Sequence, residues 1–128
     1  MSIVNLQEDF DWFAVDANGA VALFATAGQG FVPPTVVEFH VMHETVAGSI
    51  VYPNWGTDQI WNDAANLGLY VFDWSLPDGP YQRVASPEGV SDDTLPSMIK
   101  RITHLPVLKT SFADHTQITQ LDQFAPPP

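Results

Sequence analysis

The sequence predicts one α+β domain built on a mostly antiparallel sheet of about five strands, with two or three short helices in the order ββααββαβ. Two observations support this fold class. Strand-like hairpins alternate with helical stretches, and apolar residues make up 45% of a 128-residue chain, which is enough for a single core. We expect the domain over residues 1–122 and a Pro-rich disordered tail over residues 123–128 (QFAPPP).

The first hairpin is expected near the N-terminus. Residues 10–16 (FDWFAVD) and 20–26 (AVALFAT) are two apolar runs on either side of a tight turn. The turn residues Asp16-Ala17-Asn18-Gly19 fit a type I turn in which Gly19 adopts a positive φ. Because the second run is apolar on both faces, we expect a strand covered on both sides.

Residues 35–47 (TVVEFHVMHETVA) fit two structures. Pro34 before the segment and Gly48 after it favour a helix. The alternation of apolar residues at 37, 39 and 41 with other side chains would also fit a strand. We prefer the helix and keep the strand as an alternative.

The remaining elements form a second hairpin flanked by short helices. Thr57 is expected to cap the first of these helices, and Lys100 and Arg101 suit the negative end of the last one. In chain order we expect a helix over 57–66, strands over 68–75 and 81–86, a helix over 95–103 and a final strand over 107–112 (VLKTSF).

Charge is the most informative global property. The chain has 15 acidic and 4 basic residues, a net charge of −11, and residues 1–82 contain no Lys or Arg. Such a surface repels nucleic acid phosphates, so we expect no nucleic-acid binding. It would instead attract a basic protein by long-range electrostatics.

Other classes of protein are disfavoured by what the sequence lacks. The chain contains no cysteine, which excludes disulfides and Cys-bound zinc. It shows no secretory signal pattern and no apolar run long enough to span a membrane. We therefore expect a cytoplasmic protein, monomeric or homodimeric, with no cofactor.

The segment HVMHE is the one place where metal chemistry could arise. On a helix His40, His43 and Glu44 would share one side, with His104 or His115 as further ligands. The spacing matches neither HExxH nor its reverse HxxEH. A polar helix face is the preferred interpretation, and a small metal-dependent enzyme or metal sensor is the alternative.

Tryptophan and aspartate occur together in three stretches, DFDW, YPNWGTDQIWND and FDWSLPDG. Exposed Trp surrounded by carboxylates is typical of an interface for a basic partner. The alternative is that the Trp are core residues and the Asp are turn or cap residues. The candidate partner-binding residues are Asp11, Asp16, Trp55, Asp58, Asp63, Asp73, Trp74 and Asp78.

FDWFAVDANGAVALFATAGQGFVP, followed by WNDAANLGLYVFDW, resembles a pattern of small uncharacterised bacterial proteins of the immunity type, which act in polymorphic-toxin systems. The resemblance covers about residues 9–86. It implies a non-enzymatic protein that neutralises a basic toxin domain, and it supplies no catalytic residue. A structural or assembly subunit whose apolar hairpin pairs between chains is a further alternative.

Overall fold

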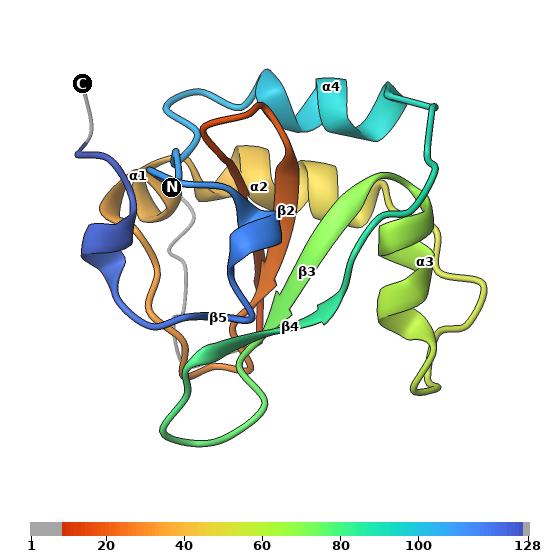
Figure 1. The fold of residues 1–128 in the computed structure, drawn as a ribbon, viewed down its shortest axis with the longest axis horizontal. Coiled ribbons are helices and arrows are strands. Elements are labelled where there is room, and N and C mark those ends of the chain that lie inside the picture. Colours follow the sequence, from red (N-terminus) through yellow and green to blue (C-terminus); the bar gives the residue numbers. More distant parts are fainter. Residues whose placement is uncertain (1–8, 127–128) are drawn as a thin grey trace.

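The computed structural model describes residues 9–126 and shows a five-stranded sheet with helices packed on it (Figure 1). The strands lie side by side in chain order: β1 (Asp11–Val15), β2 (Val21–Ala25), β3 (Leu69–Asp73), β4 (Tyr81–Ala85) and β5 (Gln117–Ile118). All neighbouring pairs are antiparallel except β2 and β3, which are parallel. The predicted single α+β domain with a mostly antiparallel five-stranded sheet is confirmed.

The helices occur in the predicted order, except that one expected helix is divided into two. Over the described residues they are α1 (Pro34–Glu38), α2 (His40–Gly48), α3 (Ile60–Asn66) and α4 (Thr94–Lys100), with 3₁₀ turns η1 (Phe112–Asp114) and η2 (Leu121–Gln123). The segment expected as one helix is broken at Phe39, whose ψ of 30° is not helical, and the strand alternative for it is wrong. Thr57 does not cap α3, because Gln59 occupies the N-cap position. The Thr57 hydroxyl instead accepts the backbone N–H of Gln59, two residues further along the chain.

The first hairpin forms as predicted. The Asp16 N–H donates to the Ala20 carbonyl at 2.8 Å, and Gly19 has a φ of 85°. The Asp16 carboxylate supports the turn, because its Oδ1 accepts the N–H groups of Asn18 and Ala20, each at 2.9 Å. All five residues of β2 are buried, as expected for a strand covered on both faces.

Each face of the sheet has its own core. Phe13, Leu23 and Val71 lie in register on one face, where α2, α3 and α4 pack against the strands. Trp12, Phe24 and Phe72 lie in register on the other face; the first two rings stack at 4.2 Å and the last two at 5.1 Å. This aromatic face is covered by the C-terminal segment, through Leu108, Phe112, Ile118 and Phe124.

The C-terminal segment differs from the prediction in two ways. The strand expected over residues 107–112 is reduced to single bridges, from Val107 to Val15 and from Leu108 to Phe124, and the last strand is β5. The tail expected from residue 123 starts too early. Phe124 is only 5% exposed and lies against the ring of Trp12, and the Ala125 N–H donates to the Val107 carbonyl. Residues 127–128 of that tail lie outside the described residues.

Among the described residues, every helix is too short to cross a lipid bilayer.

Candidate functional site at the acidic end of the sheet

Two of the predicted aspartates meet at one end of the sheet. Asp11 begins β1, Asp73 ends β3, and both are in register with Ala25 on β2, the strand between them. Residues in register across neighbouring strands point to the same face, so the two carboxylates flank the Ala25 methyl group. Ala25 itself is only 3% exposed, so its methyl group is covered by the rest of the chain.

The environment of Asp11 disfavours its charged form. Burial, together with the neighbouring carboxylates of Asp9 and Asp73, raises the pKa of Asp11 to about 7. Burial also raises the pKa of Asp73, although a hydrogen bond from the Ser75 hydroxyl opposes the rise. The Asp9 carboxylate accepts the Ala27 N–H at 3.2 Å. We call Asp9, Asp11 and Asp73 the acidic end.

No Lys or Arg of the described residues forms an ion pair with the acidic end. A Cβ atom added at Gly19 would be 3.7 Å from the Lys100 amine, so Lys100 lies at the hairpin end of β1. A five-residue strand spans about 17 Å, which exceeds the screening length of about 8 Å at physiological salt. The Arg83 guanidinium donates to the carbonyls of Phe112 and Ala113. Within residues 9–126 no Lys or Arg forms an ion pair.

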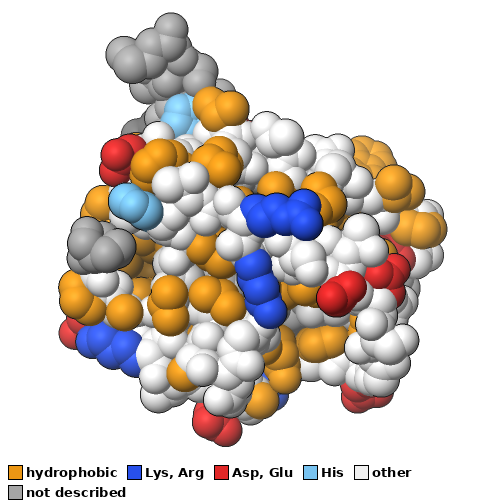
Figure 2. All heavy atoms as spheres, turned by 90° about the horizontal axis from the view of Figure 1, so that it is seen from above, with side chains coloured by type: hydrophobic (Ala, Val, Ile, Leu, Met, Phe, Trp, Pro, Cys, Tyr) orange, Lys and Arg blue, Asp and Glu red, His pale blue; other side chains and the backbone are white. Residues whose placement is uncertain are grey.

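Figure 2 shows the molecule from the α4 side. Lys and Arg side chains lie over the middle of this face and at its lower left edge, and Asp and Glu side chains are found mainly towards its margins.

An exposed tryptophan lies on the loop between α2 and α3. Trp55 is 77% exposed, and α3 supports its loop because the Asp63 carboxylate accepts the backbone and side-chain N–H groups of Asn54, at 2.8 and 2.7 Å. Tyr52, at the start of this loop, connects it to the sheet. Its pKa is raised by burial and then by the carboxylates of Asp11 and Asp63, so it lies within electrostatic range of both.

Some predicted partner-binding residues have structural positions instead. Asp16 and Asp63 are 3% and 7% exposed, and their oxygens are occupied by internal hydrogen bonds. Trp74 is half-buried: its indole N–H donates to the Pro77 carbonyl and its ring packs edge-on against Tyr81. Asp58 and Asp78 are exposed.

Sequence reasoning missed Asp9 as a member of the acidic end. A signal was present, because Asp9 and Asp11 alternate in the stretch DFDW and side chains two residues apart in extended chain share a face. The pairing of Asp11 with Asp73 had no such signal, because it depends on the parallel contact of β2 with β3.

The histidines of the metal hypothesis are not brought together. His40 Nδ1 lies 3.2 Å from the Glu44 carboxylate, whereas His43 is fully buried and its Nδ1 accepts the Phe13 N–H at 3.1 Å. His104 packs against Phe39, and His115 contacts the Thr110 hydroxyl. Among residues 9–126 no group of three or more His, Asp or Glu side chains is placed to hold a metal ion.

Comparisons with protein-family models, curated proteins and solved structures found no match to this chain. The geometry of the acidic end and of the Trp55 loop is therefore the basis for assigning a function.

Proposed function

We propose that this protein is a non-enzymatic binding protein whose acidic end receives a basic side chain of a protein partner. The observation that carries the proposal is the arrangement of Asp11 and Asp73 on either side of Ala25, with Asp9 nearby and the lysine nearest the hairpin at the opposite end of β1. Carboxylates that repel one another and lack an internal cation are complementary to an external one.

A lysine or arginine of the partner would change the electrostatics of this end. Its positive charge between Asp11 and Asp73 would favour the ionised carboxylates and lower the pKa of Asp11 from about 7. Binding would then release a proton at any pH where Asp11 is partly protonated in the free protein. Partner affinity should therefore increase as pH rises from 6 to 8.

Trp55 supplies the apolar part of the interface. Large exposed aromatic side chains are frequent hot spots of protein interfaces, where they contribute most when surrounded by polar groups. Trp55 is 77% exposed, and its loop is held in place by the bonds between Asn54 and Asp63. The partner would thus contact a fixed aromatic anchor beside a set of carboxylates.

The resemblance to immunity-type proteins extends the proposal to one class of partner. We propose that the basic partner is a bacterial toxin domain and that binding in the cytoplasm covers its active surface. The absence of Lys and Arg from residues 1–82 supports a partner of high positive charge.

Affinity purification from the native host at low and at high salt tests this function. The bait is the wild-type protein, compared with Trp55→Ala and with the double variant Asp11→Asn/Asp73→Asn. A basic protein should be retained at low salt by the wild type and reduced on both variants. Asp114→Asn changes the exposed acid that ends η1 and serves as the control. Recovery of no basic protein at either salt concentration, or equal recovery on all baits, would refute the proposal.

A further inference from the structure

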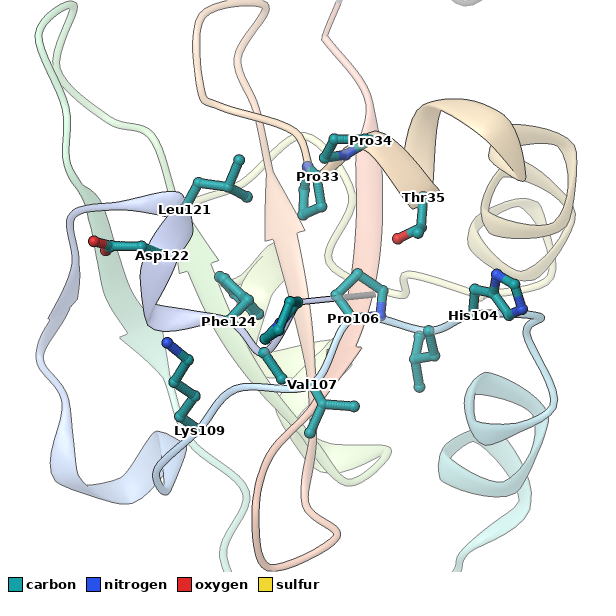
Figure 3. A pocket seen from close by; sticks show the side chains of 13 residues that line it. Pro33, Pro34, Thr35, His104, Pro106, Val107, Lys109, Leu121, Asp122 and Phe124 are labelled. Carbon is teal, nitrogen blue, oxygen red and sulfur yellow. The ribbon is translucent and has the colours of Figure 1, made fainter. Parts of the chain in front are cut away.

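A cavity lies on the aromatic side of the sheet (Figure 3). Its volume is about 570 Å³, within the range of about 300–1,000 Å³ of small-molecule sites. Three separate segments form it: the start of α1, the connection from His104 to Lys109, and the chain from Leu121 to Pro126. None of the acidic-end residues or the Trp55 loop lines it, so it is independent of the proposed protein interface.

The cavity walls are apolar and rigid. Proline contributes four of the lining residues, Pro33, Pro34, Pro106 and Pro126. Their rings have a fixed φ and few side-chain conformations, so little conformational entropy is lost when a ligand packs on them. Phe124 forms part of the floor, and Val107 and Leu121 are each about 40% exposed on its edge.

Two backbone hydrogen bonds join the C-terminal segments that line the cavity. The Val107 carbonyl accepts the Ala125 N–H at 2.7 Å, and the Lys109 N–H donates to the Gln123 carbonyl at 3.1 Å. An extended peptide recognises a binding edge through free backbone donors and acceptors. Since these groups are occupied, the cavity selects a ligand that is held by apolar contact and not by strand addition.

One cationic side chain lies at the rim. Figure 3 shows Lys109 extending beside Phe124, while the Asp122 carboxylate points outward from the cavity. Within residues 9–126 the Lys109 amine forms no ion pair. It is one of only four cations in a chain of net charge −11, and it lies at the edge of an apolar cavity.

We propose that this cavity binds an amphipathic monoanion, an acyl chain with a carboxylate headgroup. The acyl chain lies against Pro106 and Phe124, and the carboxylate pairs with the Lys109 amine. Apolar contact with a preformed wall supplies most of the affinity. The charge pair sets the orientation of the ligand and discriminates against molecules without an anionic group.

Titration with decanoate, followed by calorimetry and by amide chemical shifts, tests this site. We expect saturable one-to-one binding, with shifts around residues 104–109 and 121–126. Decanol, which keeps the chain and lacks the charge, should bind at least about tenfold more weakly. Lys109→Glu should weaken decanoate binding about tenfold or more, equivalent to about 1.4 kcal/mol.

Two variants serve as controls for charge and for location. Lys100→Glu makes the same change in net charge on α4, away from the cavity lining, and should leave decanoate affinity unchanged. Val107→Trp, at a side chain 40% exposed, should fill the cavity and abolish binding while the melting temperature stays close to that of the wild type.

Three results would overturn the proposal. The first is the absence of saturable decanoate binding. The second is equal affinity of the Lys109→Glu and Lys100→Glu variants. The third is tighter binding of decyltrimethylammonium than of decanoate, which would show that the net negative charge and Asp122 outweigh Lys109 and that the cavity prefers a cation.

Discussion

The carboxylate of Asp16 connects the first hairpin to the C-terminal segment, because its Oδ2 accepts the backbone N–H of Phe112 at 2.8 Å. The other oxygen, Oδ1, accepts the N–H groups of Asn18 and Ala20 within the turn. One buried side chain therefore stabilises both a local turn and a contact between distant parts of the chain.

Replacing Asp16 should destabilise the protein strongly. Asp16→Ala leaves three backbone N–H groups without their acceptor, one of them in a buried bond. We expect a loss of about 2–4 kcal/mol in the free energy of unfolding, measured by urea denaturation. Asp78→Ala, at an exposed aspartate, should change it by less than about 0.5 kcal/mol. Equal stability of the two variants would show that the carboxylate bonds contribute little.

Gly30 should be intolerant of a side chain because of Tyr81. A Cβ atom at Gly30 would clash with the Tyr81 hydroxyl, which accepts the Trp12 indole N–H at 3.1 Å and donates to the Phe31 carbonyl at 2.8 Å. Gly30→Ala should cost about 1–3 kcal/mol of unfolding free energy. Gly48→Ala is the matched control: it lies at the end of α2 with no heavy atom within 4 Å of the added Cβ, and it should be neutral or stabilising.

A double variant isolates the clash. Tyr81→Phe removes the hydroxyl and its two hydrogen bonds, and in that background Gly30→Ala loses its nearest obstacle. The cost of the double variant should be smaller than the sum of the two single costs. Additive costs in the double-mutant cycle would show that the clash comes from the Tyr81 ring carbons, which phenylalanine keeps, and not from the hydroxyl.

Asp11 should make the folded protein less stable as pH rises. In the unfolded chain an aspartate loses its proton near pH 4, whereas burial and the carboxylates of Asp9 and Asp73 raise the pKa of folded Asp11 to about 7. Between these pH values the folded state binds the extra proton, so its contribution to stability falls from pH 4 to pH 7 and is constant above. Asp11→Asn should therefore gain stability relative to the wild type over this interval.

Urea denaturation of Asp11→Asn and the wild type at pH 4.5 and pH 8 measures the difference. Asp78→Asn, on the exposed β3–β4 loop, controls for the loss of one negative charge. A stability difference for Asp11→Asn that is the same at both pH values would show that Asp11 ionises normally in the folded protein.

His43 should have the opposite pH dependence. Burial lowers the pKa of His43 to about 4, from an ordinary value near 6.5, and its neutral Nδ1 accepts the Phe13 N–H. As pH falls from 6.5 to 4, the unfolded chain takes up a proton that the folded protein excludes, so this contribution to stability is lost. His43→Asn keeps an acceptor at a similar position without titrating. Its stability should fall less over this interval than that of the wild type.

The control for His43 is His104→Asn, at an exposed histidine. Its stability should follow the wild-type pH profile, offset by a constant. A His43→Asn profile parallel to that of the wild type would contradict the burial of a neutral imidazole. Direct titration of the His43 ring protons by NMR gives an independent value for its pKa.

The sequence was sufficient to predict the local elements of the fold. The Asp-Ala-Asn-Gly turn specifies the hairpin through its own side-chain bonds and the positive φ of Gly19, and both are visible in the residue types. The full burial of β2 followed from its apolar residues on both faces. The division of the helix at Phe39 could not be predicted, because no Pro or Gly marks it.

The features that the sequence did not predict depend on contacts between residues that are far apart in the chain. Asp16 and Asp63 were named as candidate partner-binding residues, and they are buried because backbone groups from other segments surround them. Phe124 was assigned to a tail, although its ring packs against Trp12 on the aromatic face of the sheet and is only 5% exposed. The acidic end was predicted only in part, since the register of Asp11 and Asp73 depends on the pairing of β2 with β3.

The position of Phe124 also determines when the fold can be completed during protein synthesis. The residues of the aromatic face, Trp12 and Phe24, are translated before the residues that cover it, from Leu108 to Phe124. A fold dominated by contacts between distant residues forms slowly. On the ribosome the first hairpin must therefore wait with one apolar face uncovered, and this nascent intermediate is the species most exposed to aggregation or to chaperone binding.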